Sequence, residues 1–117
     1  MITIEALKAA GANVEEGLSR CLNKEDFYLK MVNMGLNNQN FELLGPALES
    51  KDYDKAFELC HSLKGVIGNV SLTPLYDLIC ALTEKLRTRN TPDETACNEY
   101  NQLYIQIIVM QKKLLTL

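Results

Sequence analysis

The clearest repeat of hydrophobic positions in the chain lies between residues 53 and 70. Its members recur every three or four positions, which is the spacing of the buried face of a helix. Asp52 precedes the repeat and is a candidate N-cap, because its carboxylate can accept hydrogen bonds from the free backbone N–H groups of the first turn. The pattern therefore predicts an amphipathic helix with these core positions: Ala56, Leu59, Cys60, Leu63, Ile67 and Val70.

Two further helices are predicted after this one, and each is introduced by the dipeptide Thr-Pro. In Thr73-Pro74 and in Thr91-Pro92, the threonine hydroxyl is expected to cap a helix that has proline at its first position. The former helix ends near Arg89-Asn90, and the latter has Asp93 and Glu94 in its first turn. Their buried faces are predicted to consist of Leu75, Leu78, Ile79, Leu82 and Leu86 in one, and of Tyr100, Leu103, Tyr104, Ile107, Met110 and Leu114 in the other.

The N-terminal part of the chain has shorter patterns. Residues 1–22 predict one or two short helices, with Gly11 as a stop and Asn13 as the N-cap of a segment from 14 to 22. A longer helical pattern follows and ends at the loop-like, asparagine-rich run 37–40. Its apolar stripe is predicted to consist of Phe27, Met31 and Met34.

The next predicted helix carries Phe41, Leu44 and Leu48. Gly45-Pro46 inside it predicts a kink or a break, because proline removes a backbone donor and clashes with the preceding turn. Four amphipathic helices with short connections predict an all-α fold: an antiparallel up-down four-helix bundle, with the N-terminal segment packed across one end. Ile105 and Val109 lie off the main stripe of the last helix, and we expect them to contact the N-terminal segment rather than to form a weak dimer seam.

Composition agrees with this interpretation. The chain has 117 residues, which is too few for two full-sized domains, so we expect a single domain over 1–117. Leucine far outnumbers valine, a balance that favours helices over strands. The hydrophobic content of 47% is enough for one core.

Charge and cysteine content narrow the range of partners. A net charge of −3 gives no electrostatic reason to expect nucleic acid or an anionic membrane as a partner. Because the chain lacks a secretory signal pattern and any apolar run of roughly 18 residues, we expect a cytoplasmic protein. Because we assign Ile105 and Val109 to contacts within the chain, we expect it to be a monomer. The start at Met1 favours a free-standing protein over a fragment of a longer sensor. The four cysteines form no CxxC pair, so we expect reduced thiols and no metal site.

The single histidine of the chain, His61, is the candidate for chemistry. At about 100° per residue it lies opposite the apolar stripe of its helix and should face solvent. The same outer face collects Phe57, Lys64, Gly65 and Gly68. A glycine inside a helix costs about 1 kcal/mol relative to alanine, so two of them on one face indicate the close approach of a partner. Phe57 fits either the edge of the core or an apolar docking patch.

These residue types are the parts of a phosphoryl carrier. Imidazole is a nucleophile that is largely neutral near pH 7, and a lysine one turn away can neutralise a phosphoryl group placed on it. The chain has no second histidine for a Ser/His/Asp set, no Gly-rich phosphate loop and no kinase motif. We therefore expect a carrier without autonomous kinase activity.

The run CHSLKGVIGNV, from Cys60 to Val70, resembles the HxLKG signature of the histidine-containing phosphotransfer (HPt) domains of two-component phosphorelays. The resemblance implies that His61 accepts a phosphoryl group from the aspartate of a response-regulator receiver, including that of a hybrid sensor kinase, and passes it to another receiver. It also implies that Lys64 contacts the phosphate and that Gly65 and Gly68 leave room for the receiver. Mg²⁺ is then expected on the receiver, with no cofactor bound by this chain.

The chain departs from the family pattern at two positions. Cys60 stands where a small residue such as alanine is usual, and Ser71 stands where many members have glycine. Both replacements are small and leave the resemblance intact. The alternative hypothesis is a docking module for receiver or kinase domains that accepts no phosphate.

Overall fold

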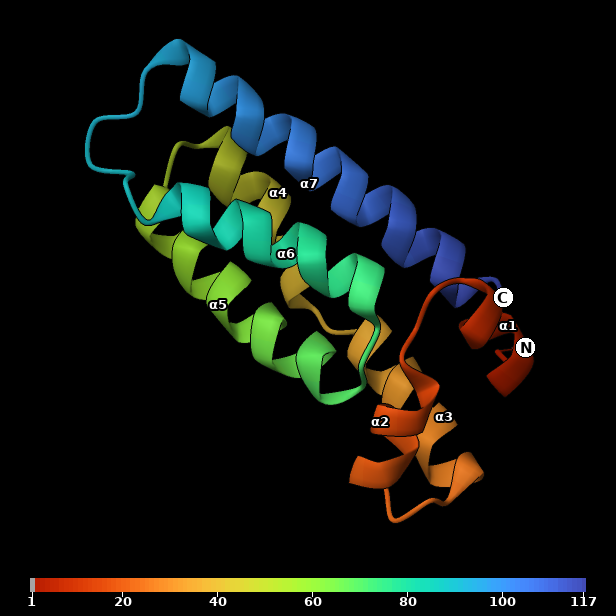
Figure 1. The fold of residues 1–117 in the computed structure, drawn as a ribbon. Coiled ribbons are helices and arrows are strands. Elements are labelled where there is room, and N and C mark those ends of the chain that lie inside the picture. The colour runs from red at the N-terminus through yellow and green to blue at the C-terminus, as the bar shows by residue number, and fades with distance from the viewer. Residues whose placement is uncertain (1) are drawn as a thin grey trace.

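The computed structural model describes residues 2–117, and within this range it contains seven helices and no strand. Helices α1 and α2 are short, with six and seven residues, whereas α3 has 12. Short turns join α4 to α5 and α5 to α6, and a longer loop over residues 87–93 leads to α7 (Figure 1). None of the helices in residues 2–117 is long and apolar enough to cross a membrane. The helix bounds are α1 Ile4–Ala9, α2 Val14–Arg20, α3 Glu25–Leu36, α4 Asn40–Glu49, α5 Tyr53–Asn69, α6 Thr73–Leu86 and α7 Glu94–Leu115.

Helices α4 to α7 form an antiparallel up-down bundle, as Figure 1 shows. Each of these helices packs against the next, and α7 returns to contact α4, which closes the bundle. The N-terminal helices lie at the end of the bundle where α5 turns into α6 and where α7 ends (Figure 1). The predicted fold class, including the position of the N-terminal segment, is confirmed.

Helix α5 is the central element of this arrangement. The Asp52 Oδ1 atom accepts a hydrogen bond from the Lys55 backbone N–H at 3.2 Å, so the predicted N-cap is confirmed. Most of its core stripe is also confirmed, since Ala56, Cys60, Leu63 and Ile67 are fully buried. Leu59 is only half-buried, and Val70 is buried as the C-cap of the helix.

Both predicted threonine caps are wrong by one or two residues. Helix α6 has Leu72 as its N-cap, and Thr73 is already the first helical residue. Helix α7 is capped by Asp93, whose Oδ1 accepts from the Ala96 N–H at 2.8 Å. A carboxylate is at least as good a capping group as a threonine hydroxyl, so the helix begins after Asp93 and leaves Thr91-Pro92 in the connection.

The predicted buried face of α3 is wrong at two of its three positions, since only Met31 packs against the core, where it is half-buried. Phe27 and Met34 are exposed, with relative accessibilities of 46% and 56%, and the buried residues are Tyr28, Val32, Gly35 and Leu36. The helix is rotated because the Tyr28 ring enters the core while its hydroxyl still finds an acceptor, the Val70 carbonyl, at 2.8 Å.

Helix α4 continues through Gly45-Pro46, so the predicted break does not occur. Pro46 lies on an exposed position of the helix. Gly45 faces α7, where a Cβ atom would come within 2.7 Å of the Tyr104 hydroxyl. This glycine therefore serves the packing of α4 against α7 rather than the end of a helix.

Ile105 and Val109 on α7 are 61% and 62% exposed, so the predicted contact with the N-terminal segment is wrong. They point away from the bundle because α7 buries a different face, which includes Tyr100, Ile107 and Leu114.

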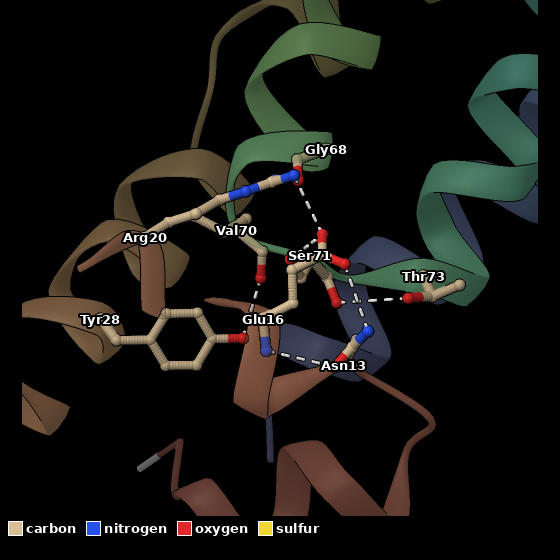
Figure 2. A network of polar contacts seen from close by, with 8 residues as sticks. All are labelled: Asn13, Glu16, Arg20, Tyr28, Gly68, Val70, Ser71 and Thr73. Atoms are coloured by element: carbon tan, nitrogen blue, oxygen red, sulfur yellow. Dashed lines mark hydrogen bonds and ion pairs between the residues drawn. The ribbon is translucent and has the colours of Figure 1, made fainter. Parts of the chain in front are cut away.

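The N-terminal helices are attached to the end of α5 by a network of polar contacts (Figure 2). The Arg20 guanidinium donates to the Gly68 carbonyl at 2.6 Å, and the Asn13 N–H donates to the Ser71 carbonyl at 2.9 Å. Ser71 has a left-handed backbone with φ of 56°, and its hydroxyl donates to Glu16 at 3.0 Å. Carbonyls at the end of α5 thus find partners in the N-terminal segment.

We expect Tyr28→Phe to lower the free energy of unfolding by about 1 kcal/mol, because the ring is kept while the buried Val70 carbonyl loses its donor. Urea denaturation measures this change.

The same hydroxyl predicts a pH dependence of stability, because burial raises the pKa of Tyr28 from 10.0 to about 12. The neutral phenol therefore stabilises the fold below pH 10, and this contribution is lost as pH rises through about 12. An alkaline stability profile that is identical in the variant would contradict this role.

Candidate functional site

His61 lies on the outer surface of α5 and is exposed, as the sequence predicts. Its neighbour Cys60 is fully buried, because adjacent helical residues point about 100° apart. The imidazole therefore stands on the outside of a helix and can meet a reacting group that another molecule presents.

Phe57 lies one turn before His61, and its ring centroid is 6.0 Å from that of the imidazole. The Phe57 side chain is half-buried, and two guanidinium groups lie over its ring. The Arg89 carbon Cζ is 4.4 Å from the ring centroid and that of Arg87 is 5.4 Å away, both within the range of cation–π contact. Phe57 is thus a platform for two cations beside His61.

The two arginines are held by different contacts. Arg89 donates to Asp54 at 2.8 Å and to the Leu86 carbonyl at 3.1 Å, which ties the end of α6 to the first turn of α5. Arg87 donates to Glu84 at 2.9 Å and is more exposed than Arg89. The sequence analysis missed both arginines, although the antiparallel return of α6 places the residues after its end beside the start of α5.

Glu84 is influenced by two cations of this surface. Its hydrogen bond with Arg87 is the main reason why the pKa of the Glu84 carboxyl lies below its usual value, and the Lys64 charge lowers it further. Lys64 is half-buried, and within residues 2–117 its ammonium group forms no ion pair with a carboxylate. Its charge is therefore available beside His61.

The two glycines of this face have different surroundings. A Cβ atom on Gly65 would meet no atom within 4 Å, so nothing inside the protein requires glycine there. A Cβ atom on Gly68 would lie 3.0 Å from the Tyr76 ring, and the Gly68 carbonyl accepts from Arg20. Gly68 therefore has a role in the packing of α6 and α2, whereas the open space at Gly65 remains unexplained by the fold.

The groups next to His61 do not compete with it as nucleophiles. Burial raises the pKa of the Cys60 thiol to about 12, so at neutral pH it is neither a nucleophile nor a ligand in thiolate form. Residues 2–117 contain no cluster of three or more His, Cys, Asp and Glu side chains that could hold a metal ion. Glu58 is exposed and, in the described chain, makes no hydrogen bond to the imidazole.

Comparison with known proteins agrees with this geometry. The family model of the Hpt domain matches residues 37–109, a range that includes α4 to α6, most of α7 and the whole surface around His61. No curated protein and no solved structure matches the chain.

The two glycines lead to a stability prediction. Gly65→Ala should raise the free energy of unfolding by about 0.5 to 1 kcal/mol, because alanine is the better helix former and its methyl group meets open space. Gly68→Ala should be the less stable of the two variants, since its methyl group displaces the Tyr76 ring. Urea denaturation of both variants tests this order, and a destabilised Gly65→Ala would show that the space is not open.

Proposed function

The chain belongs to the Hpt domain family, and we propose that it carries phosphoryl groups on His61 from one response-regulator receiver to another. Hpt domains take part in histidine phosphotransfer in phosphorelays and interact with receivers there. The observation that supports His61 as the carrier is its exposure on α5, with the cation Lys64 and the open backbone at Gly65 one turn further along the same helix.

The transfer is a displacement at phosphorus. The unprotonated imidazole nitrogen of His61 attacks the phosphorus atom of the receiver's aspartyl phosphate, and a nitrogen–phosphorus bond forms. The bond from phosphorus to the carboxylate oxygen breaks, and the aspartate leaves with the electron pair. The other imidazole nitrogen then releases its proton to water. Transfer to the second receiver is the reverse of these steps.

The chain contributes charge and access to this reaction. Lys64 lies one turn after His61 on the same face, where its ammonium group can neutralise the negative charge of the phosphoryl oxygens. Gly65 lets the backbone of a receiver loop approach the helix, because no side chain occupies that space. We assign Mg²⁺ to the receiver, where it would offset the charge on the aspartyl phosphate before the transfer.

The proposal also covers the oligomeric state of the protein, its compartment and the surface that meets the receiver. We propose that the protein works as a monomer in the cytoplasm and that the receiver of a hybrid sensor kinase is one of its donors. Gly68 and Phe57 are proposed to lie within the receiver footprint, in addition to their contacts with Tyr76 and the two arginines.

His61→Gln should abolish labelling by a phosphorylated receiver while the fold is kept, because the side chain is exposed and has no core contact to lose. The measurement is an acid-labile, base-stable label after incubation with a panel of phosphorylated receivers, with circular dichroism as the check on folding. Label on the variant would contradict the proposal. Receiver binding without label on the unmutated chain would instead favour a docking module.

Lys64→Ala should slow the transfer by about tenfold or more, since a charged hydrogen bond to a phosphoryl oxygen contributes roughly 1.5 kcal/mol. The rate is measured by rapid quench with one phosphorylated receiver in excess. Lys55→Ala is the matched control, because Lys55 is an exposed lysine on the first turn of the same helix. Equal rates for the two variants would remove Lys64 from the mechanism.

A further inference from the structure

We infer that Arg87 is a second phosphoryl-binding cation of the site and that Glu84 is its counter-ion in the unphosphorylated protein. When His61 carries a phosphoryl group, the Arg87 guanidinium exchanges the Glu84 carboxylate for the phosphoryl oxygens. The inference rests on the proposed role of His61. It assigns a function to two residues of α6 and its C-terminal end that the sequence motif does not contain.

The position of Arg87 supports this role. Its guanidinium lies over one side of the Phe57 ring, and the same ring lies next to the His61 imidazole, with centroids 6.0 Å apart. A guanidinium has five N–H donors, and within residues 2–117 the contact with Glu84 is the only hydrogen bond that the Arg87 guanidinium donates. The remaining donors are free for a phosphoryl group, with which arginine forms paired hydrogen bonds.

Arg89 lies over the same ring and is a useful comparison, because its guanidinium is held more firmly than that of Arg87. It is 23% exposed and is held by both a carboxylate and a backbone carbonyl. Arg87 is 46% exposed, and apart from its contact with the Phe57 ring its guanidinium is held only by the side chain of Glu84, three residues away. A pair that is exposed to this degree is weak and exchanges readily, so a stronger anion can replace the carboxylate.

Charge supplies the driving force for the exchange. A phosphoryl group brings a charge of roughly −1.5 to −2 at neutral pH, against −1 for the Glu84 carboxylate. In the unphosphorylated protein the Arg87 guanidinium is bonded to Glu84, and the Lys64 charge also favours the ionised form of that carboxyl, so both cations act on one negative charge. Once His61 is phosphorylated, Glu84 competes with the phosphoryl group for these cations. Glu84 therefore weakens the hold on the phosphoryl group and favours its release to the next receiver.

The first test needs no receiver. Phosphoramidate, a small phosphoryl donor, labels histidine chemically, and the chain has a single histidine, so phosphorus NMR reports on His61 alone. The pH dependence of that signal gives the acid dissociation constant of the phosphoryl group. Arg87→Gln should lower this constant about two- to fivefold, and Glu84→Gln should raise it by a similar factor, because a nearby cation favours the dianion.

The second test is the equilibrium of phosphoryl transfer with one receiver. Glu84→Gln should shift it toward phosphohistidine about two- to fivefold, and Arg87→Gln should shift it away. Glu99→Gln is the matched control, because it removes the same charge from an exposed pair, with Lys85, between α6 and α7. Glu99→Gln should leave both readouts unchanged.

The outcomes separate the two claims. If Arg87→Gln and Glu84→Gln behave like Glu99→Gln in the NMR titration, the inference is overturned, whatever the receivers do. If the titration shifts as expected but no receiver labels the unmutated chain, Arg87 and Glu84 keep their roles while the relay proposal fails. If Glu84→Gln shifts the titration only when Arg87 is also present, the carboxylate acts through the guanidinium, as inferred.

Discussion

The burial of one face of α5 determines which of its side chains reach solvent around His61. Four side chains of this face are fully removed from water, and together they fix the rotation of the helix about its axis. Since neighbouring residues on a helix point about 100° apart, burying Cys60 leaves His61 on the outside. A reactive side chain is thus held in place by the core on the opposite side of the same helix, without a specialised loop.

The antiparallel return of α6 then adds the electrostatic part of the site. Residues at its C-terminal end lie beside the first turns of α5, where Phe57 gathers two guanidinium groups and Asp54 anchors one of them. The same pairing of helices brings Tyr76 against Gly68 at the other end of α5. The face that carries His61 therefore has a cationic end near Phe57 and a tightly packed end near Gly68, with open backbone at Gly65 between them.

Sequence reasoning predicted most of what depends on one helix, although it misplaced both threonine caps, and it missed what depends on contacts between helices. Most of the stripe on α5, the Asp52 cap and the exposure of His61 follow from the local sequence alone, and these are confirmed. The buried face of α3 could not be found in this way, because Tyr28 is selected by an acceptor forty-two positions further along the chain. Arg87 and Arg89 were missed for the same reason, since only the paired helices bring them to Phe57.

The contact between Ser71 and Glu16 has a consequence for how this sequence can change over generations. Ser71 holds a backbone conformation that glycine adopts more easily, and its hydroxyl is bonded to Glu16, fifty-five positions earlier. A change to glycine relaxes the turn but removes the donor, after which Glu16 is retained only through Arg20 and Asn13. Substitutions at these two distant positions are therefore coupled, and a lineage with glycine at the turn loses one of the contacts that retain Glu16 in α2.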